Sequence, residues 1–336
     1  MAAQNPNFIF TGLDAFWRVQ DALSRDRNPS PQQWRRLFSD PGYVTLFHND
    51  PAFSEGLLRE KFSLAYRPSR GAERLRALGS GEDRLLQHYV RVGQRREDID
   101  GFLADWSQRD VAGEARAAAA RFLPRAPLKK LRDPKVSFLV FKSDARGYSR
   151  VLLGPLGALE RPDPVLLLGH EFHHFFRSRM PGVRRVSIAD RDRVRLLLSL
   201  VETEGIADLI NRPPIFHRAG PLRPADKTYV RWVEVAPELL KAVDGALCIC
   251  SRMPEVQDEM ADALLNLLPD GGHQLGFYMA REIARRLGLG AVLRCVGRPS
   301  CFFLAYQRAA LLSRNTPRFG KETVRFLKRL GSANSA

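Results

Sequence analysis

The sequence predicts an α+β protein that is mainly α-helical and contains a small β-sheet. Three observations lead to this prediction. Helical patterns fill most of residues 1–123 and return after residue 213. Two short apolar runs, residues 136–142 and 148–153, have the length and the residue types of β-strands. These runs lead into an apolar helix that contains the pattern His-Glu-x-x-His.

The first 123 residues are predicted to form a helical N-terminal region. Residues 11–14 and 30–33 have the spacing of capping boxes, and Pro31 occupies the favoured first helical position. Residues 40–42, Asp-Pro-Gly, predict a turn. Further helical patterns lie at about residues 54–65, 82–92 and 97–121. We expect the large aromatic side chains to anchor the core: Trp17, Trp34, Phe38, Tyr43 and Trp106.

A proline-rich, basic stretch predicts a domain boundary. Three prolines occur within residues 124–134, so we place the start of a second region, residues 124–336, at this point. In that region, residues 136–142 predict one strand, and Ser-Asp-Ala-Arg-Gly at 143–147 predicts a turn. The residues from Tyr148 to 153 predict a second strand.

The pattern His-Glu-x-x-His begins at His170. Residues four apart lie one turn above each other on a helix, so His170 and His174 can bind the same metal ion. Glu171 lies about 100° round the helix, beside the open coordination position. This arrangement is typical of a zinc-bound water with a carboxylate that takes its proton. Asp163 as N-cap and Pro164 at the first helical position support the helix.

Residues 196–211 predict a second apolar helix that carries acidic residues. Glu204 and Asp208 are four positions apart and share a face, and Gly205 allows another helix to approach closely. A buried carboxylate needs a cation or a hydrogen-bond partner. A zinc ion already held by two histidines would supply that cation, with Glu204 as the third protein ligand. Asp208 could then hydrogen-bond the outer nitrogen of a ligating histidine.

Three neighbouring residues have competing interpretations. Glu202 is an alternative third ligand, but it points about 200° away from Glu204 and has no acidic companion four residues later, so Glu204 is favoured. His173 lies about 100° from His174, so we expect it to be packed or solvent-facing. Arg177, one turn after His174, is expected to form a structural ion pair.

Together the two motifs resemble those of the gluzincin metallopeptidases, the thermolysin-like class, whose second motif is Glu followed four residues later by Asp. The resemblance implies a zincin-like catalytic core with a small sheet and an active-site helix. It also implies that the strand before this helix, from Tyr148 to residue 153, borders the cleft and pairs with extended substrate. An ordinary sheet edge is the alternative. The interval from His174 to Glu204 is longer than in thermolysin-like enzymes, with residues 180–182 as the expected insertion.

A helix starting near His273 and ending before Gly288 offers two candidates for stabilising an oxyanion. Gluzincins commonly use a His or a Tyr for this purpose, which by resemblance suggests His273 or Tyr278. The two lie about 140° apart on the helix, so the choice between them stays open. Gly276 contributes to a small-residue face that is suited to close packing against another helix.

The remaining C-terminal elements are predicted to be helices near residues 226–243, 254–268, 299–313 and 321–330. Four cysteines are expected to be free thiols because they lack zinc-ribbon spacing: Cys248, Cys250, Cys295 and Cys301. No apolar run approaches the length of a membrane span, and no signal peptide is visible. We therefore expect a cytoplasmic location, unless an export signal precedes the sequence.

The chain carries 53 Lys and Arg against 37 Asp and Glu, a formal net charge of +16. Such a charge suggests nucleic acid, an anionic membrane or an acidic substrate as a partner. The basic residues are scattered, without a dense basic arm or an aromatic RNA-binding motif, so nucleic acid is not favoured as the main partner. Four arginines that follow the metal-binding helix are candidates for attracting acidic peptides: Arg177, Arg179, Arg184 and Arg185.

Over most of the chain, the order of motifs resembles an uncharacterised bacterial family of putative zinc-dependent peptidases. The expected function is a zinc hydrolase, a metallopeptidase that cleaves peptide or protein substrates with Glu171 as the general base. Two alternatives stay open: a zinc-stabilised binding protein without turnover, and a basic protein associated with nucleic acid. The cleavage preference and the oligomeric state cannot be read from the sequence.

Overall fold

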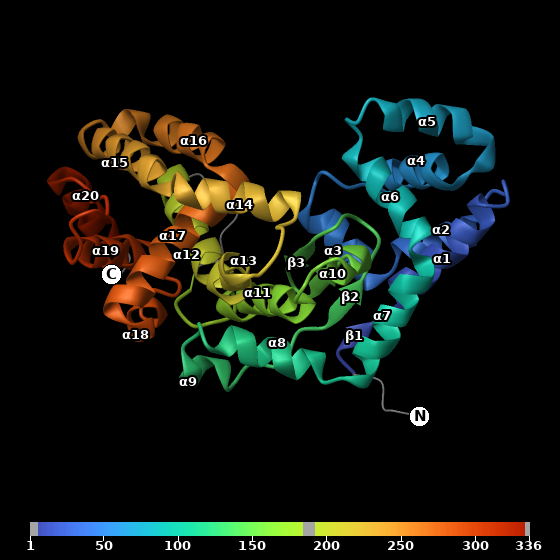
Figure 1. The fold of residues 1–336 in the computed structure, drawn as a ribbon, viewed down its shortest axis with the longest axis horizontal. Helices are drawn as coiled ribbons and strands as arrows, with labels where there is room; N and C mark the ends of the chain where they lie inside the picture. Colours follow the sequence, from blue (N-terminus) through green and yellow to red (C-terminus); the bar gives the residue numbers. More distant parts are fainter. Residues whose placement is uncertain (1–5, 184–191, 333–336) are drawn as a thin grey trace. The chain divides into compact units, whose positions relative to one another are not determined.

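The computed structural model of the protein describes residues 6–183 and 192–332 (Figure 1). These residues belong to two compact units. Unit 1 contains the chain up to Arg116 together with Arg132–Phe175, and unit 2 contains Ala117–Leu131 and the chain from Phe176 onward. The N-terminal helices, the sheet and most of the helix with the His-Glu-x-x-His pattern therefore belong to one compact unit. The prediction of a mainly helical α+β fold with a small sheet is confirmed.

Unit 1 surrounds a four-stranded sheet with helices. Its N-terminal helices are α1 (Thr11–Leu23), α2 (Pro31–Phe38), α3 (Pro41–Asn49), α4 (Glu55–Tyr66), α5 (Gly71–Gly79), α6 (Arg84–Gln94) and α7 (Arg96–Gln108), followed by α8 (Val111–Ala120), which continues into unit 2. The strands are β1 (Phe8–Ile9), β2 (Val136–Phe138), β3 (Ala145–Gly147) and β4 (Val151–Leu153). Two helices follow the sheet, α10 (Pro155–Leu159) and α11 (Pro164–Arg177).

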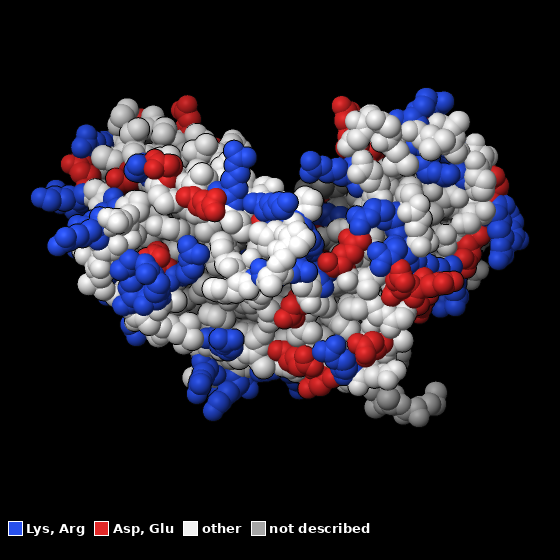
Figure 2. All heavy atoms as spheres, viewed as in Figure 1, with Lys and Arg blue, Asp and Glu red and all other residues white. Residues whose placement is uncertain are grey.

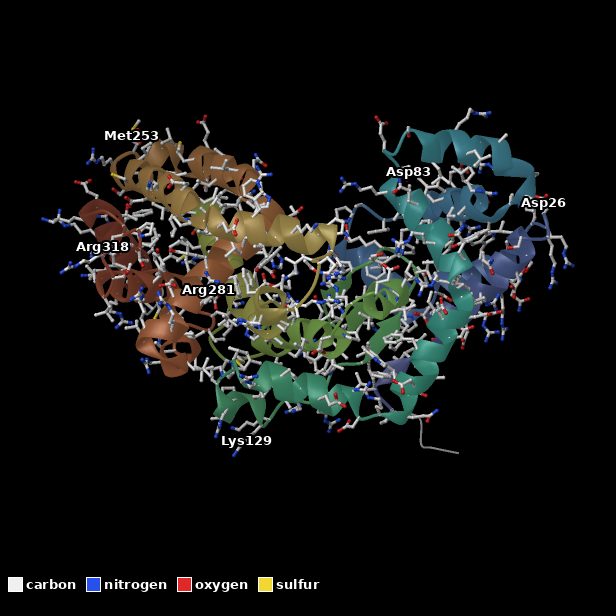
Figure 3. The ribbon with its side chains drawn as sticks, in the orientation of Figure 1. Asp26, Asp83, Lys129, Met253, Arg281 and Arg318 are labelled. Carbon is white, nitrogen blue, oxygen red and sulfur yellow. The ribbon has the colours of Figure 1, made fainter. Side chains whose placement is uncertain are left out.

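Side chains cap the N-termini of several helices in unit 1. Ser30 and Gln33 form the predicted capping box, in which each side chain bonds the other's backbone N–H. Asp83, labelled in Figure 3, caps α6 by accepting a hydrogen bond from Leu86 N at 2.9 Å. The turn predicted at 40–42 is instead the start of α3, because Asp40 accepts from Gly42 N and Pro41 occupies the first turn.

The sheet has the strand order β1-β2-β4-β3. Strands β1, β2 and β4 run parallel, and β3 is antiparallel to β4, with Ala145 opposite Leu153. This topology corrects two predictions. Residues 145–147, expected in a turn, form a strand, and Tyr148 lies in the hairpin turn, where its N–H donates to the carbonyl oxygen of Arg150. The chain reverses at 148–150 because β3 needs those residues to turn back onto β4.

The core of unit 1 contains the predicted aromatic anchors. All five side chains are buried: Trp17, Trp34, Phe38, Tyr43 and Trp106. Tyr43 also donates a hydrogen bond to the carbonyl oxygen of Val140 at 3.1 Å. The single helix predicted at 97–121 is divided into α7 and α8, because Arg109 is extended and Asp110 accepts a hydrogen bond from Gly113 N.

In its described residues, unit 2 consists of helices joined by loops. It contains α9 (Arg125–Leu128), α12 (Arg193–Asn211), α13 (Pro213–His217), α14 (Pro224–Glu234), α15 (Ala236–Arg252), α16 (Gln257–Leu267), α17 (His273–Leu287), α18 (Leu289–Leu293), α19 (Pro299–Leu311) and α20 (Lys321–Ser332). Short 3₁₀ turns occur at Pro68–Arg70 in unit 1 and at Pro254–Val256 and Pro269–Gly272 in unit 2. The helix predicted at 226–243 is divided at Val235, because Pro237 cannot continue the hydrogen-bond ladder of α14.

Helices α12 and α17 cross at two glycines. A Cβ atom on Gly205 would lie 2.3 Å from the carbonyl carbon of Gly276, and one on Gly276 would lie 2.2 Å from the carbonyl oxygen of Val201. The backbones are therefore in direct contact at this crossing, as the predicted small-residue faces allow. Gly288, at φ 78°, ends α17 as expected.

Charged side chains of both signs cover the face drawn in Figure 2, where Asp and Glu are interspersed among the more numerous Lys and Arg. Arg184 and Arg185 lie outside the described residues. None of the described helices combines the length and the apolar character that crossing a lipid bilayer requires.

Candidate metal centre

The predicted metal-binding histidines lie on α11 in unit 1. Asp163 caps this helix by accepting a hydrogen bond from Leu166 N at 3.3 Å, and Pro164 is its first residue. His170 and His174 follow one turn apart, and their Nε2 atoms are 2.9 Å from each other. His170 is buried and His174 is half-buried. Two imidazole nitrogens therefore converge on one point.

The separation of these nitrogens is compatible with a shared zinc ion. Zinc–nitrogen bonds of about 2.0–2.1 Å in a tetrahedral site place two ligating nitrogens about 3.3 Å apart. The observed 2.9 Å differs from that value by a few tenths of an ångström, which a small ring rotation would accommodate. The donor set thus suits zinc, for which imidazole is a preferred ligand.

Glu171 lies against strand β3, and a glycine makes this contact possible. A Cβ atom on Gly147 would be 2.9 Å from the carbonyl oxygen of Glu171, 3.2 Å from its Oε2 and 3.1 Å from the Cβ of His174. Only a glycine therefore allows β3 to lie this close to the motif. Gly147 was not among the predicted site residues, because it was expected in a turn; a glycine in the segment that precedes the metal-binding helix was the available signal.

Arg146 places positive charge near Glu171. Burial lowers the pKa of Arg146, but the nearby carboxylates of Asp144 and Glu171 outweigh this effect and raise it overall. The guanidinium is held by Asp144, at 2.9 Å from Nη2 to Oδ2. Tyr148 is half-buried in the adjacent hairpin turn, and burial raises the pKa of its phenol.

The strand predicted to pair with substrate is not the one at the edge of the sheet. Strand β4 is bonded to β2 on one side and to β3 on the other, so its backbone is already paired. The prediction that this strand pairs with substrate is therefore wrong, whereas a substrate-binding role for Tyr148, which lies outside the strand, stays a prediction. The last strand in the described sheet is β3, which also lies on α11.

A separate cluster of predicted site residues lies in unit 2, where α12 and α17 cross. The ring of His273 contacts two carboxylates of α12, with Nε2 3.2 Å from Glu204 Oε2 and Nδ1 2.9 Å from Asp208 Oδ2. Glu204 and Asp208 are one turn apart, so a single imidazole spans both. The Gly205–Gly276 contact brings α17 close enough for this arrangement.

Asp208 is fully buried and has several hydrogen-bond donors. Tyr229 Oη donates to its Oδ2 at 2.8 Å, and Arg212 Nε lies 3.3 Å from Oδ1. Arg212 also lies over the ring of Tyr229, 4.3 Å from its centre. Burial raises the pKa of Tyr229, and the neighbouring Asp208 raises it further. Sequence reasoning missed both partners, although Arg212 is four residues after Asp208, a spacing at which helix side chains meet.

Tyr278 is not brought together with this cluster. Its ring contacts that of Tyr306 on α19, at 6.2 Å between ring centres. His273 and Tyr278 are about 140° apart on α17, so the two side chains leave the helix in different directions. Of the two predicted oxyanion-stabilising residues, only His273 contacts Glu204 and Asp208.

Glu202 is engaged elsewhere in unit 2. It is fully buried and forms an ion pair with the Nη2 of Arg177, and it accepts a hydrogen bond from the backbone N–H of Gly297 at 2.9 Å. The prediction of a structural ion pair for Arg177 is confirmed. In unit 1, His173 is completely buried, in agreement with a packed histidine.

Comparison with known proteins adds independent information. A family model described as "Putative zinc dependent peptidase (DUF5700)" matches residues 34–315. The match spans β2 to β4, α11, α12 and α17, and therefore every candidate residue named above. The description confirms the predicted resemblance to a family of putative zinc-dependent peptidases, and with it the predicted metal, zinc. Searches of curated proteins and of solved structures gave no match.

Proposed function

The chain belongs to the family of putative zinc dependent peptidases, and from that premise we propose that it is a metallopeptidase of the gluzincin type. In this proposal His170, His174 and Glu204 bind one zinc ion, and Glu171 is the general base. The observation that carries the proposal is the 2.9 Å approach of the two Nε2 atoms on α11, with Glu171 on the same helix. Two imidazoles and one carboxylate are a known set of protein ligands for catalytic zinc.

Zinc held by these residues would polarise a peptide carbonyl and lower the pKa of a water molecule. Glu171 would take a proton from the attacking water and deliver it to the leaving amine. Its position against Gly147 limits where its carboxylate can move, and the Arg146 guanidinium places positive charge near it. A structural zinc site would have no use for this acid and usually has a fourth protein ligand.

His273 has a different role in this proposal from the one suggested by the resemblance. Both of its ring nitrogens are within hydrogen-bond distance of carboxylates, those of Glu204 and Asp208. We therefore assign it to holding the Glu204 carboxylate in place, with Asp208 fixing the ring. The extended substrate would pair with the backbone of β3, because this strand is at the end of the sheet and contacts the motif helix.

The proposal is tested by separating metal binding from turnover. The purified protein should contain about one zinc per chain, and His170→Ala should deplete it. Glu171→Gln keeps the size of the side chain but removes the base, so zinc should be retained while hydrolysis of a peptide library falls by roughly two to four orders of magnitude. His48→Ala, a change at an exposed histidine of α3, is the matched control and should alter neither quantity.

Two results would contradict the proposal in different ways. Normal turnover by Glu171→Gln would exclude Glu171 as the base. Full zinc with no cleavage of any library peptide by the unmodified protein would favour the zinc-stabilised binding protein.

A further inference from the structure

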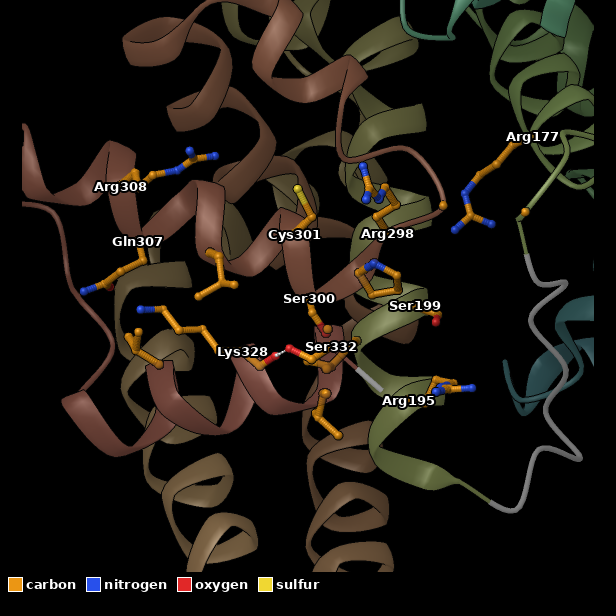
Figure 4. A pocket seen from close by; sticks show the side chains of 18 of the residues that line it. Arg177, Arg195, Ser199, Arg298, Ser300, Cys301, Gln307, Arg308, Lys328 and Ser332 are labelled. Carbon is orange, nitrogen blue, oxygen red and sulfur yellow. Dashed lines mark hydrogen bonds between the residues drawn. The ribbon is translucent and has the colours of Figure 1, made fainter. Parts of the chain in front are cut away.

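Unit 2 contains a cavity of about 1080 Å³ whose lining includes none of the proposed metal ligands (Figure 4). It is bordered by the N-terminal half of α12, by α19 and by α20. Pockets that bind small organic molecules commonly measure about 300–1,000 Å³, so this cavity is large enough for one. Its apolar lining includes Leu198, Leu304 and Val324.

The first turn of α19 faces this cavity. Ser300 and Cys301, the second and third residues of this 13-residue helix, line it. The N-cap residue is Arg298, whose side chain makes no capping hydrogen bond among the described residues. The N–H groups at a helix start carry partial positive charge and favour an anion when no side chain caps them.

Side-chain cations add to this positive potential. Arg298, Arg308 and Lys328 line the cavity, and within the ranges that the structure describes none of them has an ion-pair partner. By contrast, Arg177 at the rim is paired with Glu202. Figure 4 shows Arg298 and Arg308 on either side of Cys301. Cationic groups in a cavity without a matching acid create a site that favours an anionic ligand.

The thiol of Cys301 lines the cavity at this helix start. Its Sγ is 3.5 Å from that of the buried Cys295. The hydrogen bond from Cys295 lowers the pKa of Cys301 to about 6, against the effect of burial, and Arg298, Arg308 and Arg294 contribute to the lowering. The arginines thus add to a lowering whose main cause is the contact with Cys295.

We propose that this cavity binds a small organic anion, with a carboxylate or phosphate group at the first turn of α19 between Arg298 and Arg308. The apolar lining would contact the rest of the molecule. An organic ligand is favoured over a free inorganic ion because the cavity is much larger than an inorganic phosphate and has apolar walls. The proposed site is independent of the zinc chemistry.

Alkylation of Cys301 tests the positive potential directly. The zinc-loaded 336-residue chain is treated with iodoacetate or with its neutral isostere iodoacetamide, and modification of each cysteine is followed by mass spectrometry. Cys248, which lies outside the cavity lining, is the internal reference. The iodoacetate-to-iodoacetamide rate ratio should be about tenfold higher at Cys301, since a cationic cavity concentrates anions.

Matched variants assign this effect to the cavity. Arg298→Gln and Arg308→Gln should each reduce the rate ratio at Cys301 several-fold, and Arg314→Gln, a change at an exposed arginine outside the lining, should leave it unchanged. Equal ratios at Cys301 and Cys248 in the unmodified protein would overturn the proposal.

Ligand protection then tests the organic anion itself. Benzoate and phenyl phosphate should slow the modification of Cys301 by iodoacetamide several-fold at saturation, and neutral benzamide should not. Comparison of the first two probes distinguishes a carboxylate from a phosphate site. Protection by benzamide equal to that by benzoate would overturn the anionic requirement. Protection by inorganic phosphate as strong as that by phenyl phosphate would overturn the apolar part of the proposal.

Discussion

Glu202 and Glu204 are identical side chains two positions apart on α12, yet their surroundings differ. Glu202 is fully buried with the Arg177 guanidinium and the Gly297 N–H as its partners. Glu204 keeps about a fifth of its side chain exposed and contacts the imidazole of His273. The first environment compensates a buried charge, and the second places an imidazole beside the carboxylate that the proposed function assigns to the metal.

Substituting each glutamate with glutamine should separate these roles. Glu202→Gln leaves the Arg177 charge buried without its partner, so the free energy of unfolding in urea should fall by about 3–5 kcal/mol while zinc content is retained in the folded protein. Glu204→Gln should deplete zinc and, measured on zinc-free protein, change stability little. Full zinc in Glu204→Gln together with depletion in Glu202→Gln would reverse the ligand assignment.

The two candidates on α17 can be distinguished in the same way. His273→Ala removes the contact that holds Glu204, so zinc affinity should fall by roughly 10- to 100-fold, as for other residues that orient metal ligands. Tyr278→Phe, which changes a residue packed on Tyr306, should alter neither zinc affinity nor kcat. A large loss of kcat in Tyr278→Phe with normal zinc content would return the oxyanion-stabilising role to the tyrosine.

At the level of secondary structure, the contact between α12 and α17 depends on two glycines. A Cβ atom added to either glycine would lie within 2.5 Å of backbone atoms of the other helix. Backbone atoms cannot move aside as a flexible side chain can. This contact brings His273 of one helix to Glu204 and Asp208 of the other. Any change that separates the helices is therefore expected to disturb the contacts of His273 with Glu204 and Asp208.

Gly276→Ala tests this dependence. The added methyl group would collide with the Val201 carbonyl oxygen, so the helices must separate, and stability should fall by about 1–3 kcal/mol with a parallel loss of zinc affinity. Gly245→Ala on α15 is the matched control, since a Cβ there meets nothing within 4 Å. That change should be neutral or stabilising by up to about 1 kcal/mol. Equal effects of the two substitutions in thermal unfolding would show that the crossing tolerates a methyl group.

At the level of the whole molecule, the net charge of +16 bears on the choice of substrate. A positive field would raise the local concentration of acidic peptides. If the proposed peptidase activity holds, kcat/KM for peptides containing Asp or Glu should exceed that for basic peptides of equal length. The difference should shrink between low and physiological salt, where screening limits the field to about 8 Å.

A neutral peptide of the same length provides the reference for this comparison, and its rate should change little with salt. Equal rates for acidic and basic peptides at low salt would show that the arginines serve solubility rather than substrate capture. Equal rates would have a physical explanation in Figure 2, where Asp and Glu side chains are interspersed among the Lys and Arg side chains and divide the positive surface.

The sequence by itself determined the features that depend on one element. The spacing of His170 and His174 places both on one face of a helix, and Asp163 with Pro164 starts that helix where expected. The share of helix and the small sheet also follow from local patterns. These properties are local because 3.6 residues per turn and a strand period of two relate neighbours along the chain without reference to the rest of the molecule.

Only the tertiary structure decided which elements meet. Nothing in the local pattern of residues 143–153 indicated that β3 would be the last strand or that Gly147 would lie on Glu171. Similarly, Glu202 and Glu204 have the same side chain, and the ion pair of Glu202 with Arg177 in the folded protein distinguishes their environments. Such contacts join residues distant in sequence, so they depend on how whole elements pack, and packing is set by the combined shape of many side chains rather than by any single motif.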